Sequence, residues 1–230
     1  LPSGIVVFVS TFNRSVGGMA VGQQFGEAEL ALLVIGGYLL GVVSPLRNSI
    51  SDVLLPALAA QARAGGTQWV ETWRRSSVQV AILLFPLAVL SARYAEPFLA
   101  AAFAPRYAAA APLLRWHAAL LALACLDVAL VLRVLGRTRR MLGVSVVTLG
   151  LNLALLPLLL PRMGVAGAAA ALLASSAAGT LYLAMQATRA LGLSLTQFLP
   201  LAGLGRVALA ALLAASLLWP SWWHESFGLV

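Results

Sequence analysis

Residues 141–188 read MLGVSVVTLGLNLALLPLLLPRMGVAGAAAALLASSAAGTLYLAMQAT, which is two long apolar runs joined by the turn sequence Pro161-Arg162-Met163-Gly164. A helix needs about 20 mostly apolar residues to cross a hydrocarbon core of about 30 Å, because each residue adds only ~1.5 Å. The runs 141–160 and 165–188 both meet this requirement. They therefore predict a pair of membrane-spanning helices.

The same pattern extends over the rest of the chain. Further spans are expected at 3–22, 29–60, 76–92, 108–135 and 201–219, which makes about seven. The stretch 29–60 is too long for one span, so its last turns are expected to project into solvent beyond Pro45 and Arg47. The 230 residues are 61% hydrophobic and only 10% charged, which excludes an ordinary soluble domain. The sequence predicts an all-α integral membrane protein.

The charge of the chain is better explained by membrane topology than by a nucleic-acid partner. All 15 basic residues are arginines and the formal net charge is +8, but the arginines lie between the apolar runs and form no patch with interleaved aromatics. Alternate connections place nine of them on one face: Arg63, Arg74, Arg75, Arg133, Arg137, Arg139, Arg140, Arg189 and Arg206. Basic residues are retained in the cytoplasm, so this face is predicted to be cytoplasmic. The tryptophans at 219, 222 and 223 are expected to form an outer interfacial belt, or to be simple hydrophobic fill.

Small residues at four-residue spacing predict where helices touch. Helices in lipid associate by close packing, which small side chains permit. The clearest row lies in 165–188 and consists of Gly167, Ala171, Ser175 and Gly179. Shorter rows are formed by Gly18, Gly22 and Gly26, and by Gly37 and Gly41.

Polar residues at membrane depth are the candidates for function, since a buried charge usually faces a cavity or a partner. Arg14 lies near mid-membrane and is expected to line an anion-binding cavity or to pair two helices. Arg115 and His117 could serve a site or reach headgroups and water, and His117 is also a candidate for proton coupling. For Asp127, a pair with Arg47 or Arg133 is favoured over cation binding.

Amide side chains within the spans are expected mainly to form hydrogen bonds between helices; they are Asn152, Gln79 and Gln186. The sequence holds no phosphate-binding loop, HExxH or GxSxG motif. Its one cysteine, Cys125, is expected to be a buried, inert thiol. We therefore expect neither an enzyme nor a bound cofactor or metal.

The order of several motifs resembles that of a known family. The motifs are Asn13-Arg14 in the first span, Leu54-Leu55-Pro56-Ala57-Leu58, Arg74-Arg75 before Phe85-Pro86, the segment 103–115 ending Leu114-Arg115, and Leu151-Asn152-Leu153 before the segment 161–170. In this order they resemble the C-terminal half of O-antigen-type polysaccharide flippases, within the multidrug/oligosaccharidyl-lipid/polysaccharide exporter superfamily. Family members often have an acidic residue where this chain has Asn13, which puts carboxylate-based ion coupling there in doubt.

The resemblance implies a six-helix lobe over residues 1–192 and an additional helix with an outer segment over 193–230. An N-terminal lobe would precede Leu1. The implied function is flipping of undecaprenyl-diphosphate-linked oligosaccharide across the bacterial inner membrane, with membrane lipids as further partners. Arg14, Arg115, Arg47 and Asn152 would bind the substrate, and His117 and Asp127 are candidates for ion coupling. The alternatives are a cation-coupled multidrug exporter of the same superfamily and a non-transporting membrane scaffold.

Overall fold

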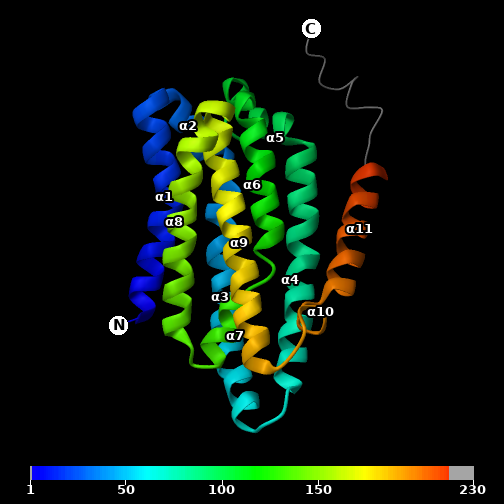
Figure 1. Cartoon of the computed structure of the whole chain (residues 1–230). Coiled ribbons are helices and arrows are strands. Elements are labelled where there is room, and N and C mark those ends of the chain that lie inside the picture. Colours follow the sequence, from blue (N-terminus) through cyan, green and yellow to red (C-terminus); the bar gives the residue numbers. More distant parts are fainter. Residues whose placement is uncertain (1, 218–230) are drawn as a thin grey trace.

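The structure, a computed structural model, describes residues 2–217, and within this range it contains helices and no strand (Figure 1). Helix α1 (Pro2–Phe25) stands at one edge of a bundle and α11 (Leu201–Leu217) at the other. Among residues 2–217, five helical segments are long and apolar enough to cross a membrane, or six if one bent pair counts as a single span. The chain is thus an all-α membrane protein, as predicted, although its seventh expected span is a shorter apolar helix, α11.

The two apolar runs at 141–188 form the most extensive helix pair of the bundle. They are α8 (Thr138–Met163) and α9 (Val165–Leu191), joined at Gly164, whose φ of 58° lies in the left-handed region that glycine tolerates. The predicted row Gly167, Ala171, Ser175 and Gly179 is buried along α9. A Cβ atom on Gly167 would lie 2.6 Å from the carbonyl carbon of Leu159, and one on Gly179 would lie 2.5 Å from Thr148 Oγ1. The row is therefore a helix contact, as the spacing indicated.

The expected single helix over 29–60 is wrong, because the chain bends there by 42°. Helix α2 (Glu27–Gly36) is followed by Gly37, and α3 (Tyr38–Arg63) then continues in a new direction. Both glycines at the bend lie against α6: a Cβ atom on Gly36 would be 2.6 Å from Leu113 Cβ, and one on Gly37 would be 3.2 Å from His117 Nε2. Close packing of the backbone against a neighbouring helix accompanies the break.

The last turns of α3, which were expected to project into solvent, have one face packed and the rest exposed. The helix runs through Pro45 and Pro56 to Arg63. Leu58, in this part of the helix, is fully buried in a cluster with Trp69 and Trp73 of α4 (Gln68–Arg93). Leu58 is therefore part of the core between α3, α4 and α7, whereas Ala60, Gln61 and Arg63 in the last turn are exposed.

The expected span over 108–135 is also interrupted. It begins with a 3₁₀ helix, η1 (Pro105–Ala110), and continues as α6 (Ala111–Leu123). After a break of four residues α7 (Val128–Val134) follows, with Asp127 as its N-cap. An aspartate before an apolar run is a typical start signal for a helix, so this break had a signal in the sequence. A short helix, α5 (Ala95–Ala102), precedes η1.

The connections that carry the nine arginines lie at one end of the bundle. The α3–α4 loop, the α7–α8 corner and α10 (Leu195–Phe198) all lie at the lower end in Figure 1, whereas the α8–α9 turn lies at the opposite end. Successive connections between the spans therefore alternate between the two ends of the bundle, as the topology prediction assumed. That the arginine-rich end faces the cytoplasm stays a prediction, and the three tryptophans of the expected outer belt lie outside the described residues.

Candidate functional site

A cavity of about 850 Å³ lies within the bundle and is lined by residues of α1, α2, α3, α6, α8 and α9. Most of its wall is apolar side chains and glycine. The polar side chains on the wall are Arg14, Ser15, Gln23, Ser44, Arg47, His117, Asn152, Ser176 and Thr180. Four of the six site residues proposed from the sequence are in this set. Ser44, Gln23 and Thr180 had no signal in the sequence beyond being polar residues within a span.

The two arginines of the cavity come from different helices, Arg14 from α1 and Arg47 from α3. Arg14 Nη1 donates a hydrogen bond to Ser44 Oγ at 3.3 Å, and Arg47 Nη2 donates to Asn48 Oδ1 at 2.9 Å. The Nε atom of Arg47 is buried and has no hydrogen-bond partner. No carboxylate lines the cavity in the described part of the chain. No carboxylate among the described residues of the cavity wall neutralises the two guanidinium groups, and their fork of donors suits an anion such as phosphate.

Asn152 lies on the cavity wall and links two helices. Its side chain is 1% exposed, and its Nδ2 donates to the backbone oxygen and Oδ1 of Asn13 at 3.0 and 2.9 Å. This is the interhelix hydrogen bond that the sequence favoured, and it joins α8 to α1. Asn152 Oδ1 is buried without a partner, so the amide has one hydrogen-bond position left for a group in the cavity.

His117 lines the cavity, whereas Arg115 does not, although only one residue separates them. His117 is 5% exposed, and its Nδ1 lies 2.8 Å from the carbonyl oxygen of Leu113. Since a carbonyl oxygen only accepts hydrogen bonds, Nδ1 carries a proton in this contact. The other ring nitrogen, Nε2, lies on the side of Gly37. Arg115 forms an ion pair with Glu96 at 3.2 Å. Residues two apart are about 200° apart around a helix, which separates the two side chains.

Asp127, at the break between α6 and α7, forms hydrogen bonds with residues of three helices. Its Oδ1 accepts a hydrogen bond from Leu130 N at 3.3 Å, and its Oδ2 accepts one from Ser51 Oγ at 2.5 Å. Trp73 Nε1 donates to the Asp127 backbone oxygen at 3.1 Å. The favoured pairing with Arg47 or Arg133 is not what the structure contains, because Arg133 pairs instead with Asp52 at 3.0 Å. Asp127 therefore connects α7 to α3 and α4 outside the cavity lining.

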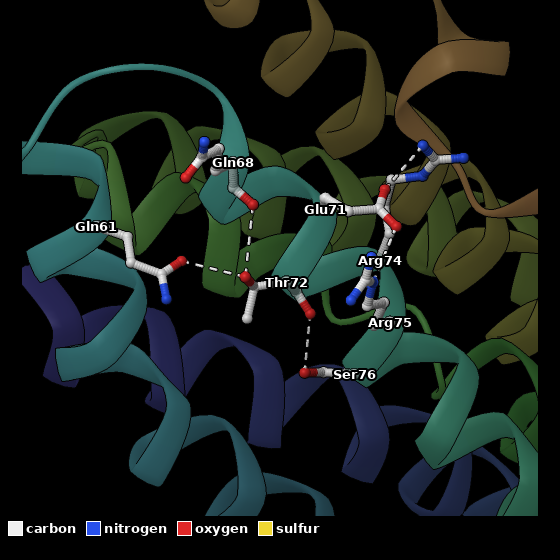
Figure 2. A network of polar contacts seen from close by, with 7 residues as sticks. All are labelled: Gln61, Gln68, Glu71, Thr72, Arg74, Arg75 and Ser76. Atoms are coloured by element: carbon white, nitrogen blue, oxygen red, sulfur yellow. Dashed lines mark hydrogen bonds and ion pairs between the residues drawn. The ribbon is translucent and has the colours of Figure 1, made fainter.

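A second polar network closes the α3–α4 hairpin at the arginine-rich end (Figure 2). Glu71 pairs with Arg74 and with Arg75, both at 3.2 Å, within the first turns of α4. Thr72 Oγ1 donates to Gln61 Oε1 of α3 at 3.1 Å. These contacts are exposed and mostly join residues within one or two turns of a helix. The network therefore ties together the end of α3 and the start of α4. Within residues 2–217 no group of three or more metal-ligating side chains comes together.

These features define a multi-pass membrane protein with a cationic cavity between its helices. Residues 5–112 match a family described as polysaccharide biosynthesis protein, which is a little under half of the chain. The matched segment runs from α1 to the start of α6 and includes Arg14, Ser44 and Arg47. No curated protein and no solved structure matches the chain. The family match supports the resemblance to polysaccharide flippases and indicates a polysaccharide-related membrane protein.

Proposed function

We propose that this chain, in the complete protein, forms half of the wall of a cavity that carries undecaprenyl-diphosphate-linked oligosaccharide across the bacterial inner membrane. The single observation that carries the proposal is the pair Arg14 and Arg47 on one cavity, with no carboxylate among the described lining residues. Sugars and a diphosphate cannot cross hydrocarbon unaided, because every desolvated polar group must find a partner. The cavity provides such partners inside the bundle.

In this proposal the arginines receive the diphosphate and the amide of Asn152 contacts sugar. Arg14 exchanges its bond to Ser44, at 3.3 Å, for shorter charge-assisted bonds to phosphate oxygens. The polyprenyl tail stays in lipid. Alternating access then requires the two lobes to rock about the site, as in transporters built from repeats. Arg115 is left out of this role because it pairs with Glu96 away from the cavity.

The test uses Arg14→Ala in the full-length protein, in cells that lack the native copy. Surface polysaccharide and the lipid-linked precursor left in the inner leaflet are measured at equal protein abundance. Because a hydrogen bond to a charged group contributes about 1.5–3 kcal/mol, transport is expected to fall at least about tenfold. Arg162→Ala is the matched control, since Arg162 is exposed and lies at the α8–α9 turn, outside the cavity. Wild-type transport by Arg14→Ala would overturn the assignment.

The two alternatives make other demands on the chain. A cation-coupled drug exporter needs a carboxylate or equivalent in its cavity, and the described lining has none. A scaffold needs no anion site, so it predicts that Arg14→Ala and Arg162→Ala behave alike in the transport measurement. The same experiment therefore separates the flippase from the scaffold.

A further inference from the structure

Four arginines at one corner of the bundle have no acidic partner in the described part of the chain. They are Arg137, Arg139, Arg140 and Arg189. The carboxylates at the same end are occupied elsewhere: Glu71 pairs within α4, Asp52 pairs with Arg133, and Asp127 bonds to Ser51 and caps α7. The corner therefore keeps its positive charge.

These arginines lie at the start of α8 and the end of α9, two helices that are in contact at this end. Arg140, in the first turn of α8, donates a hydrogen bond from Nη1 to Gln186 Oε1 of α9 at 3.0 Å. Arg189 follows Gln186 by three residues, which places the two side chains on the same face of α9. Arg139, Arg140 and Arg189 are all exposed. The start of α8 and the end of α9 thus present their guanidinium groups together.

The same two helix faces become apolar a short way along the bundle. Val146 and Val147 lie seven residues after Arg139 and Arg140, and Tyr182 lies seven residues before Arg189. Seven residues are two turns, or about 10 Å, so each apolar residue lies on the face of its arginine. Val147 is 63% exposed and Tyr182 is 41% exposed. Charge at the helix ends and apolar surface two turns deeper match the order of headgroup and acyl chain in a lipid.

We propose that the surface formed by the start of α8 and the end of α9 binds an anionic glycerophospholipid. The phosphate would lie among Arg139, Arg140 and Arg189, and an acyl chain would lie along Val147 and Tyr182. Arginine forks bind phosphate oxygens in pairs, and basic pockets between membrane helices are known as sites for acidic headgroups. The site lies apart from the cavity and does not depend on the transport proposal.

Binding is tested with the purified full-length protein in detergent by native mass spectrometry. Phosphatidylglycerol and phosphatidylcholine are titrated separately, and only the first is expected to remain bound. Each basic residue near an anionic lipid surface contributes about 1 kcal/mol, or about fivefold in affinity. The triple variant R139Q/R140Q/R189Q is therefore expected to bind phosphatidylglycerol about 100-fold more weakly.

The matched control R63Q/R162Q/R206Q removes the same charge from three exposed arginines that form no ion pair in residues 2–217. It should weaken binding by no more than a few-fold. An equal loss in both variants would show only a general charge effect and would overturn the site, as would equal binding of both lipids to the wild type.

A second measurement keeps the test valid if the glutamine variant fails to fold. A photoactivatable phosphatidylglycerol added to the wild-type protein should form adducts on peptides from the start of α8 and the end of α9. Adducts confined to other helices would contradict the proposal. The charge-retaining variant R139K/R140K/R189K should keep most of the affinity, because the point charge remains although the fork is lost.

Discussion

Replacing Gly167 by alanine should destabilise the bundle, even though alanine is the better helix former. A Cβ atom at this position would lie 2.6 Å from the carbonyl carbon of Leu159 and 2.9 Å from the nitrogen of Leu160. Those atoms belong to the backbone of α8, so no side-chain rotation can relieve the overlap, and the two helices must separate. Added volume in a well-packed contact costs about 1–3 kcal/mol.

The helix propensity of alanine offsets part of this cost, by at most about 1 kcal/mol. The net effect is then a loss of up to about 2 kcal/mol in the free energy of unfolding, with the upper end expected here because the overlap is with rigid backbone. Gly150→Ala is the matched control, because Gly150 lies inside α8 with no heavy atom within 4 Å of an added Cβ. That variant keeps the propensity gain without the overlap, so it should be neutral or more stable than the wild type.

Unfolding is followed by tryptophan fluorescence while sodium dodecyl sulfate is titrated into protein in a mild detergent. Gly167→Ala should lower the midpoint, and Gly150→Ala should leave it unchanged or raise it. A Gly167→Ala protein as stable as Gly150→Ala would refute the reasoning, because it would mean that α8 and α9 are not in backbone contact there. A further variant, Gly179→Ala, should be milder, since it meets the Thr148 side chain, which can rotate.

Three further outcomes follow from single contacts. Trp73→Phe should lower the unfolding free energy by about 1 kcal/mol, because the hydrogen bond to the Asp127 backbone oxygen is lost and a buried acceptor is left open; the check is the same detergent titration, and an unchanged midpoint would contradict it. Asn152→Ala should cost about 0.6–1.7 kcal/mol, as expected for one hydrogen bond between membrane helices, here to Asn13. Cys125, 3% exposed, should react with N-ethylmaleimide only after denaturation, and rapid labelling of the native protein would show that the α6–α7 break is open.

The sequence anticipated the features that depend on local composition. The apolar runs located the helices because length and hydropathy alone decide whether a segment can cross a membrane. The row from Gly167 to Gly179 indicated a helix contact because small residues at this spacing permit close approach. Arg14 was placed in a cavity because a charge at that depth needs a polar environment. Each inference required only the residues of one segment.

Other features depend on rotation about a helix axis and on neighbours distant in the chain. Arg115 and His117 appear equivalent in the sequence, but α6 turns one toward Glu96 and the other toward the cavity. Arg133 forms an ion pair with Asp52, and Asp127 accepts a hydrogen bond from Ser51, because α7 begins beside α3 after a break. The bend at Gly37 likewise coincides with a close contact with α6, which lies far away in the sequence. Hydropathy and spacing determined that this chain is a helical membrane protein; only tertiary packing decided which polar groups face the cavity, because packing fixes the direction of each helix face.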